Sequence, residues 1–352
     1  MNKGNKKRII VTSSQVPFIR GGAEILIEDL TENLLKRNFL VETVSLPFKW
    51  YPTNEILKGA LAWRFLDISE SNGDKVDLVI ATKFPSYVVE HPNKVVWLVH
   101  QLREAYDLYG SEYSDLHTTK DSRSTRDQII KLDNRTLGEA KSIYTISKNV
   151  ATRLSKYNGI VGTHLYPPPR NHKLYRAGNF GNYILSIGRL DKKKRVDLLI
   201  ASLKYTDKSI KCIIVGSGPE RLLLEKLVEE LGLHERVEFL GQVQEEDLIE
   251  LYANCFSVYY SPLDEDYGYV TVEALLSKKP VVTTNDSGGV LEFVGDGVGG
   301  LISDPRPDAI GKSINSLYAN KKLGLMLGDA GYQLVKDLNW DDVVDELTKS
   351  IL

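Results

Sequence analysis

Short runs of apolar, β-branched residues alternate with stretches of helical periodicity along the chain, and the whole alternation occurs twice. In the first half the runs are RIIVTSS (8–14), LVETVSL (40–46), VDLVIAT (76–82), KVVWLVH (94–100), SIYTIS (142–147) and THLYPPP (163–169). In the second half they are YILSIG (183–188), CIIVG (212–216), VEFLG (237–241), FSVYYSP (256–262), PVVTTN (280–285) and GGLIS (299–303). Continuous apolar runs suit parallel strands that helices cover on both faces. The sequence therefore predicts an α/β protein with two doubly wound domains.

The boundary between the two domains is predicted at a run of three prolines, Pro167 to Pro169. Such a run cannot continue a helix and stays stiff and extended, so it suits a linker. A chain of 352 residues also exceeds the usual size of one hydrophobic core. We therefore expect one domain over 1–168 and a second over 169–337. The final segment, over about 338–352, is expected to be helical and is a candidate to pack back on the first domain.

The composition excludes several classes of protein. A net charge of −2 argues against a general nucleic-acid binder. Two cysteines do not suffice for a disulfide framework or indicate a zinc site. No apolar run is long enough to span a bilayer and MNKGNKKRIIVTSS lacks the apolar core of a signal peptide, so a cytoplasmic protein is expected. Residues 1–168 carry 23 Lys+Arg and 19 Asp+Glu, net 23 − 19 = +4, which leaves open a peripheral contact with the inner face of a membrane.

The loops that follow the strands are expected to carry the chemistry, because ligands of open α/β sheets bind at the carboxyl ends of the strands. Two such domains facing each other would create a deep cleft there. In the loop SSQVPFIRGGAE, Gly21 and Gly22 precede an amphipathic helix, where free N–H groups would favour an anion. A simple tight turn explains these glycines equally well. His100 ends an apolar strand at the same edge, and it is either a ligand-binding residue or an ordinary packed histidine.

Two further loops of the second half carry glycine or positive charge. In SIGRLDKKKRVDLLI, Gly188 ends a strand, Arg189 follows it and Lys194 lies five residues later. A guanidinium beside a strand-terminal glycine matches the oxygens of a phosphate, although the lysines alone also suit a solvated turn. In IIVGSGPE, Gly216 and Gly218 form a strand-to-helix turn. The third glycine of a dinucleotide fingerprint is missing, so NAD or FAD is weakly indicated.

The acidic loop LDEDY and the helix after it contain Glu265 and Glu273, eight residues apart, with a helix start near Gly268–Tyr269. The N–H groups of this helix start can hold a phosphate. The two carboxylates would repel a diphosphate, but they suit hydroxyl groups on either side of it. The implied ligand is a nucleotide sugar. Two alternatives remain, an ordinary acidic loop and an Asp-x-Asp type of metal site formed by 264–266.

Together these motifs resemble glycosyltransferase family 4, a retaining family with the GT-B fold of two Rossmann-like domains facing across a cleft. The resemblance covers nearly the full chain. Its most specific part is the segment from Glu265 through Gly268 to Glu273, followed by KKPVVTTNDSGGVLEFVGDGVGGLI. The stretch WLVHQLREAYDLYG is similar to a bacterial subgroup that takes part in polysaccharide biosynthesis.

The resemblance implies a role for each matching residue. Arg189 and Lys194 would bind the donor diphosphate, and Glu273 would hold the ribose hydroxyls. Glu265 would contact the donor sugar, and His100 would bind the transferred sugar. The other residues implied in donor binding are Gly21, Gly22, Gly188, Gly216, Gly218, Gly268, Tyr269 and Val270. This sequence departs from the family pattern at Tyr267, where Phe is common, and at Arg195, where Gly is common, which leaves open which cation reaches the phosphate.

The function that follows from the resemblance is transfer of a hexosyl or related group, with retention, from a nucleoside diphosphate sugar. The acceptor would be a saccharide, a lipid-linked molecule or a small molecule. No metal and no cofactor besides the donor is expected. The alternatives are a sugar-nucleotide epimerase or phosphorylase of the same fold, and a non-catalytic subunit that binds nucleotide sugar. The base, the sugar, the linkage and the oligomeric state are not encoded in any motif that we recognise.

Overall fold

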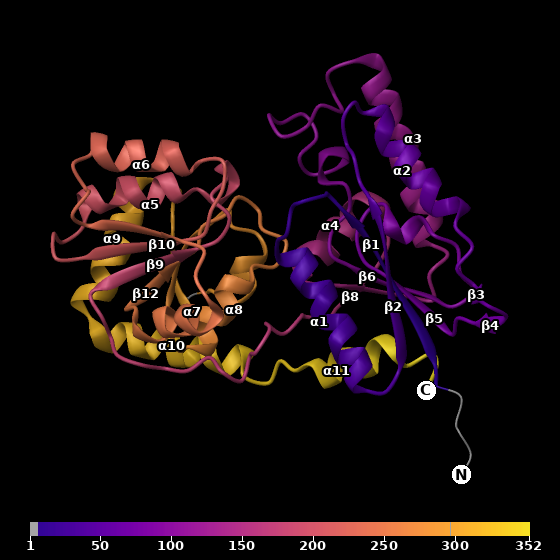
Figure 1. The fold of residues 1–352 in the computed structure, drawn as a ribbon. Helices are drawn as coiled ribbons and strands as arrows, with labels where there is room; N and C mark the ends of the chain where they lie inside the picture. The colour runs from indigo at the N-terminus through magenta and orange to yellow at the C-terminus, as the bar shows by residue number, and fades with distance from the viewer. Residues whose placement is uncertain (1–5, 296) are drawn as a thin grey trace, which may run out of the picture. The chain divides into compact units, whose positions relative to one another are not determined.

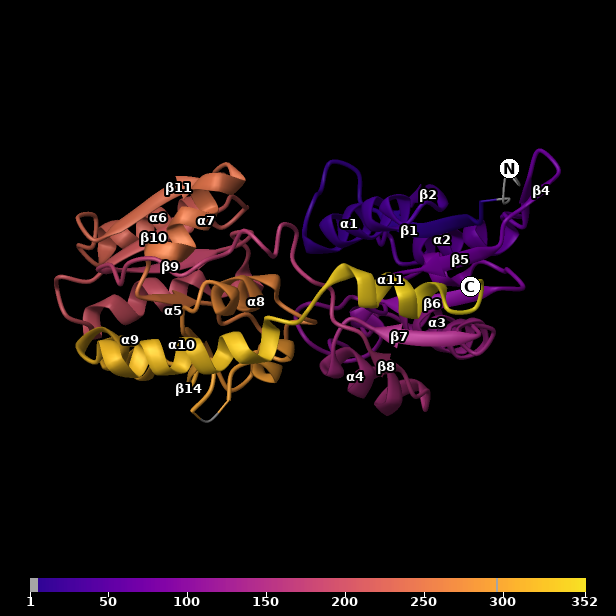
Figure 2. The same ribbon diagram turned by 90° about the horizontal axis from the view of Figure 1, so that it is seen from below.

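The computed structural model describes residues 6–295 and 297–352, which form two compact units. Unit 1 comprises residues 1–168 together with 339–352, and unit 2 comprises residues 169–338. Each unit contains one six-stranded parallel sheet, as the ribbons of Figures 1 and 2 show. The central strands form because most of their residues are apolar, so that both faces of each sheet can be covered, whereas the edge strand Leu40–Pro47 has no fully buried residue.

The sheet of unit 1 has the strand order β2-β1-β5-β6-β7-β8. The strands are β1 (Arg8–Gln15), β2 (Leu40–Pro47), β5 (Leu78–Ala81), β6 (Lys94–Leu98), β7 (Ser142–Thr145) and β8 (Thr163–His164). A short hairpin of β3 (Glu70–Ser71) and β4 (Asp74–Lys75) stands apart from this sheet. All residues of β5 and β6 are buried, in agreement with a central position in the sheet.

The helices of unit 1 are α1 (Gly22–Lys36), α2 (Asn54–Phe65), α3 (Lys120–Leu137), α4 (Lys148–Asn158) and α11 (Trp340–Thr348). The last of these, α11, comes from the far end of the chain and packs against α1. Its Trp340 ring lies 6.0 Å from that of Trp97 in β6, edge to face. Arg37 binds Asp341 at 2.9 Å, so both apolar and charged contacts hold the C-terminal helix on unit 1.

The sheet of unit 2 has the order β11-β10-β9-β12-β13-β14. Its strands are β9 (Tyr183–Ile187), β10 (Lys211–Val215), β11 (Val237–Gly241), β12 (Ser257–Tyr259), β13 (Val281–Thr284) and β14 (Gly300–Ser303). Its helices are α5 (Val196–Ser202), α6 (Arg221–Glu230), α7 (Glu245–Asn254), α8 (Tyr269–Leu276), α9 (Pro307–Ala319) and α10 (Lys321–Val335). In Figure 1, α5 and α6 cover one face of this sheet, while α7 and α8 cover the other. The predicted doubly wound α/β fold is confirmed in both halves.

The strand order gives each sheet a topological switch point. There, two neighbouring strands are followed by connections that run on opposite faces of the sheet. In unit 1 the chain runs from β1 outward to β2 and then returns to β5 on the other side of β1. In unit 2 it runs from β9 outward to β11 and then returns to β12 beside β9. The loops after β1 and β5, and those after β9 and β12, therefore diverge and leave a crevice at the carboxyl edge of each sheet.

Among the described helices, none combines the length and the apolar character that a membrane crossing requires.

Candidate active site

The switch point of unit 2 brings together two of the residues singled out in the sequence. Lys194 ends the short 3₁₀ turn Lys192–Lys194 after β9, and Glu265 lies in the loop after β12. The ammonium group of Lys194 binds Oε2 of Glu265 directly. The hydroxyl of Tyr260 lies 3.1 Å from the Lys194 Nζ and donates to the same Glu265 oxygen at 3.0 Å. The three side chains form a compact, charge-balanced cluster.

The surroundings keep Lys194 charged and Tyr260 protonated. Burial by itself would lower the pKa of Lys194, but the adjacent Glu265 carboxylate and the Tyr260 hydroxyl raise it above its ordinary value. Burial, and then the same carboxylate, raise the pKa of Tyr260, whose hydroxyl therefore stays protonated. Lys194 is thus a permanent cation, placed beside a carboxylate that an incoming ligand has to share or displace.

The start of helix α8 lies next to this cluster. Its N-cap is Gly268, in the left-handed region at φ +87°, and the helix runs from Tyr269, as the sequence predicted. A Cβ atom at Gly268 would lie 3.6 Å from Cγ of Glu265 and only 2.9 Å from the ring of Tyr260, so the position needs a glycine. Val270 is buried in the first turn. The N–H groups of a helix start favour an anion, which places a second element suited to phosphate beside Lys194.

Two tyrosines hold the carboxylate of Glu273. Its carboxylate accepts a hydrogen bond of 2.6 Å from the hydroxyl of Tyr252 on α7, and Tyr175 from the segment before β9 also bonds to it. Burial raises the pKa of Glu273, whereas these two hydroxyls counteract the shift. The side chain is half-buried and fixed in one orientation, as a residue that grips hydroxyl groups requires.

Arg195, the departure from the family pattern, does not compete with Lys194 for the same place. Its guanidinium group forms a bidentate pair with Asp286, at 2.7 and 2.8 Å. Arg189, in contrast, is exposed next to Gly188, and its backbone carbonyl accepts a hydrogen bond of 2.9 Å from the N–H of Asp191. Of the two adjacent cations at 194 and 195, the structure therefore directs Lys194 toward Glu265.

Gly216 and Gly218 have a packing role that the sequence did not reveal. A Cβ atom at Gly216 would overlap the carbonyl oxygen of Gly188, and one at Gly218 would overlap that of Leu190. The two glycines allow the loop after β10 to lie against the loop after β9. A contact with a nucleotide at either position stays a prediction.

In unit 1, helix α1 begins at Gly22, and its N-cap is Gly21. Its N–H donates to Oε2 of Glu24 at 2.9 Å, and the other oxygen of Glu24 binds Lys83 Nζ at 2.5 Å. His100 lies two residues after β6, with its Nδ1 2.8 Å from the carbonyl oxygen of Gln101. Donor binding by Gly21, Gly22 and His100 stays a prediction.

Sequence reasoning missed Tyr260, Tyr252 and the ion pair of Lys83 with Glu24. A tyrosine near a strand end is a common core residue, so nothing in the sequence separates Tyr260 from its neighbour Tyr259. Within the described ranges, no group of three or more His, Cys, Asp or Glu side chains is placed to hold a metal ion.

Comparison with protein families gives a match within unit 2. Residues 172–334 match the family described as glycosyl transferases group 1. The matched range lies within unit 2 and includes the cluster at Lys194 and Glu265. The resemblance drawn from the sequence is confirmed at the level of group 1, while the finer assignment to family 4 stays a prediction.

Three curated relatives resemble the chain. The uncharacterized glycosyltransferase MJ1178 of Methanocaldococcus jannaschii is 28% identical over 57% of this chain and 56% of its own length. The human alpha-1,3/1,6-mannosyltransferase ALG2 is 30% identical over 44% and 41%. A second protein of M. jannaschii, the uncharacterized glycosyltransferase MJ1607, is 23% identical over 97% and 96%. The chain thus matches about half of the first two relatives and nearly all of the third, at lower identity.

Among solved structures, Alr3699/HepE of Anabaena in complex with UDP and glucose has a TM-score of 0.71 to this chain. The superposition covers 98% of this chain and 99% of that one, with 19% sequence identity. At this identity the similarity concerns the fold, and it extends over both units. The chain has the GT-B fold.

Proposed function

We propose that this chain, whose second unit matches the group 1 glycosyl transferases within a complete GT-B fold, transfers a sugar from a nucleoside diphosphate sugar to an acceptor. The observation that carries the proposal is the direct contact of Lys194 with Glu265 at the switch point of unit 2, beside the start of α8. Cation, helix start and carboxylate suit a diphosphate and a neighbouring sugar hydroxyl. All three lie where an open α/β sheet binds its ligand.

In this proposal the diphosphate takes the place of Glu265 as the main partner of Lys194. Lys194 and the exposed Arg189 bind the phosphates, together with backbone N–H groups at Gly268, Tyr269 and Val270. Glu265, released from the ammonium group, accepts a hydrogen bond from a hydroxyl of the donor sugar. Glu273 accepts hydrogen bonds from the ribose.

The chemical role of the two cations follows from where charge develops. When the bond between the sugar and the diphosphate breaks, negative charge builds on the departing phosphate, and fixed positive charge stabilises it. Lys194 is suited to this because its raised pKa keeps it charged. We propose that no metal is needed for this step, that the configuration at the anomeric carbon is retained, and that the departing phosphate takes the proton of the acceptor. His100 is proposed to bind the transferred sugar.

The transferred group is proposed to be a hexosyl or related residue, and the acceptor a saccharide, a lipid-linked molecule or a small molecule. One relative is named as a mannosyltransferase, and this name supports a sugar as the transferred group or as part of the acceptor. A cytoplasmic location, with or without peripheral contact at a membrane, is part of the same proposal.

The test is a thermal-shift screen of the full chain with UDP-, GDP- and ADP-sugars, followed by product analysis with the donor that binds. A specific donor raises the unfolding midpoint by mass action. Formation of a glycosylated acceptor and a nucleoside diphosphate supports the transferase, and inhibition by EDTA with recovery on adding Mn²⁺ or Mg²⁺ would contradict its metal independence. Turnover that needs inorganic phosphate, or change of the nucleotide sugar without an acceptor, would instead indicate the phosphorylase or the epimerase.

A non-catalytic subunit is the remaining alternative, and one variant separates it from the transferase. Glu265→Ala removes a side chain that a transferase needs for turnover, whereas a subunit that only binds a partner would keep its role in the cell. Loss of the cellular product with normal protein levels supports the transferase.

A further inference from the structure

Arg195 has a backbone conformation that is unusual for a residue with a side chain. Arg195 has φ +51° and ψ +43°, in the left-handed region that disfavours every residue with a side chain except Asn and Asp. It stands between the turn Lys192–Lys194 and helix α5. A glycine would adopt this conformation without strain, whereas an arginine adopts it at a cost in backbone strain.

The side chain makes contacts that offset this strain. Besides its bidentate pair with Asp286, the guanidinium group donates to the Ser261 carbonyl at 2.8 Å, to the Pro262 carbonyl at 3.1 Å and to Oγ1 of Thr284 at 2.8 Å. The side chain is only 14% exposed, so these bonds form largely out of water. Planar, bidentate pairing of this kind is specific to arginine, because lysine offers a single point charge.

These bonds connect three loops at the carboxyl edge of unit 2. Arg195 itself continues the loop after β9, Ser261 and Pro262 lie in the loop after β12, and Thr284 ends β13 with Asp286 in the loop that follows. The hydroxyl of Ser261 also bonds to that of Thr284 at 2.6 Å. One guanidinium group thus fixes the spacing of the loops on both sides of the switch point.

Backbone bonds extend this connection to Glu265. The N–H of Leu263 donates to the Lys193 carbonyl at 2.8 Å, and that of Asp264 to the Asp286 carbonyl at 2.9 Å. The N–H of Glu265 donates to the Ser287 carbonyl at 3.2 Å. The loop that presents Glu265 is therefore held between the two loops that Arg195 ties together.

We propose that Arg195 is a positioning residue, which sets the distance between the Lys194 ammonium group and the Glu265 carboxylate without touching the substrate. Lys194 is its immediate neighbour in the chain, and Glu265 lies three residues beyond Pro262. The proposal rests on the proposed function for its kinetic consequences, but the connection between the loops can be tested without any activity.

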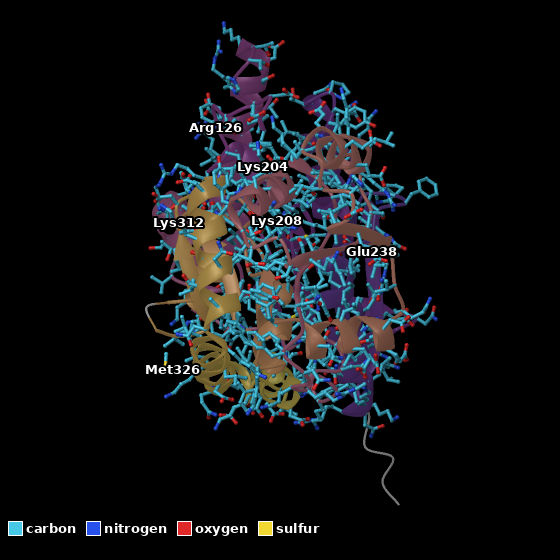
Figure 3. All side chains as sticks on the ribbon, turned by 90° about the vertical axis from the view of Figure 1, so that its left-hand side faces the viewer. Arg126, Lys204, Lys208, Glu238, Lys312 and Met326 are labelled. Carbon is cyan, nitrogen blue, oxygen red and sulfur yellow. The ribbon has the colours of Figure 1, made fainter. Side chains whose placement is uncertain are left out.

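Unit 2 offers a matched control, because Arg236 is a second guanidinium group with several bonds. It donates to the carbonyls of Leu203 and Ile210, at 2.8 and 3.0 Å, and to Oγ1 of Thr206 at 2.7 Å. Arg236 precedes β11, at the amino edge of the sheet, and the loop it holds carries the exposed Lys204 and Lys208, which Figure 3 labels on the surface of unit 2. A purely structural arginine in the same unit is thereby available.

The kinetic experiment compares Arg195→Gly, Arg195→Lys and Arg236→Ala with the wild type in the full chain. Glycine tolerates the backbone conformation and removes the whole side chain with its guanidinium group. We expect Arg195→Gly to lower kcat/KM by about 100-fold, mostly through kcat, since a displacement of about 1 Å can cost that much. Millimolar guanidinium ion should restore part of the rate of Arg195→Gly. The kcat/KM of Arg195→Lys should lie between those of Arg195→Gly and the wild type.

The control decides between positioning and mere stability. Arg236→Ala should lower the unfolding midpoint at least as much as Arg195→Gly, yet leave kcat/KM of the folded enzyme within about twofold, since it acts at the other edge of the sheet. Equal kinetic loss in both variants, or an Arg195→Gly enzyme with unchanged kcat/KM, would overturn the proposal.

Hydrogen exchange separates this proposal from the proposed function. In Arg195→Gly the amides of 263–265 should exchange faster than in the wild type, and in Arg236→Ala they should not. Unchanged exchange in Arg195→Gly overturns the positioning role even if the wild type is an active transferase. Faster exchange together with a wild type that transfers no sugar supports the connection between the loops and refutes the proposed function.

Discussion

Both units carry a partly buried Lys–Glu ion pair at the switch point of the sheet, and the two pairs are built differently. In unit 1, Lys83 follows β5 and Glu24 lies in the first turn of α1 after β1, with side chains 10% and 17% exposed. In unit 2, Lys194 follows β9 and Glu265 follows β12, with side chains 23% and 22% exposed. The topology is the same, so the difference lies in what else each carboxylate holds.

Glu24 uses both of its oxygens on the protein, one on Lys83 and one on the N–H of Gly21, the N-cap of α1. Its pair serves the fold, because it caps a helix and neutralises a buried ammonium group. At Glu265, the oxygen Oε2 accepts hydrogen bonds from both Lys194 and Tyr260, and the start of α8 lies alongside. We propose that the more exposed pair, in the unit that matches the group 1 family, is the one that a ligand opens.

The strongest test of this comparison is Glu265→Gln, which keeps the shape and removes the charge. We expect the transfer rate to fall by on the order of 1,000-fold, as when a group that acts on the reacting centre is lost, while the unfolding midpoint changes little. Initial rates with the donor found in the screen measure the first quantity, and thermal unfolding the second. A variant that keeps more than a tenth of the wild-type rate would remove Glu265 from the site.

The reverse pattern is expected for Lys83→Met in unit 1. Removing one partner of a buried pair leaves the other charge uncompensated, so the free energy of unfolding should fall by about 3 kcal/mol. The double variant Lys83→Met, Glu24→Gln should recover part of that loss, and Lys194→Met should cost only about 1 kcal/mol because its pair is more exposed. Urea unfolding checks all three. If Lys194→Met proves the more destabilising, the distinction between the two pairs fails.

Unit 1 also contains a buried acid with a measurable effect on pH dependence. Burial raises the pKa of Asp133 to about 7, and the hydroxyl of Tyr106 donates to it at 2.6 Å. An unfolded aspartate titrates near 4, so between these values the folded protein binds the extra proton, and stability decreases as pH rises. We expect a decrease of about 2 kcal/mol from pH 5 to pH 7.

The variant Asp133→Asn should remove this slope and be more stable than the wild type at pH 8. Asp127→Asn, at an exposed position of the same helix, is the control and should keep the slope. Urea midpoints measured across this pH range give both results. A slope that persists in Asp133→Asn would assign the titration to another group.

The smallest predicted effect concerns the hydroxyl of Tyr260. Tyr260→Phe removes its bonds to Lys194 and Glu265, which should lower stability by about 1 kcal/mol and kcat/KM by about fivefold. In unit 1, Tyr144→Phe loses a comparable bond of 2.9 Å to Glu346 and should leave kcat/KM unchanged. Equal kinetic effects of the two variants would show that Tyr260 has no special place in the site.

The strands were predictable because burial on both faces of a parallel sheet demands continuous apolar residues, and that demand is visible in the sequence itself. The start of α8 was predictable because a glycine that follows an acidic loop marks the turn at Gly268. The C-terminal segment was a candidate to pack on the first domain, but the particular contacts of α11, such as Trp340 with Trp97, join residues more than 200 positions apart, and local patterns contain no sign of such partners.

The sequence singled out candidate site residues but not the pairs that they form. Lys194 and Glu265 were identified separately, as a phosphate ligand and a sugar ligand, and their direct contact depends on β9 and β12 being neighbours in space. The positioning role that we propose for Arg195 could not be predicted from the sequence, because its partner Asp286 lies 91 positions away. The tyrosines around Glu273 look like core residues in the sequence, and only the fold shows which hydroxyl meets which carboxylate.

The central claim is that Lys194 serves a diphosphate, and calorimetric titration of the full chain tests it most directly. A nucleoside and its diphosphate are titrated into the wild type and into Lys194→Met, in the uridine, guanosine and adenosine series. The account predicts that one diphosphate binds the wild type at least about 100-fold more tightly than its nucleoside, and that Lys194→Met loses most of that difference. Equal binding of nucleoside and diphosphate, or a preference that survives intact in Lys194→Met, would contradict it.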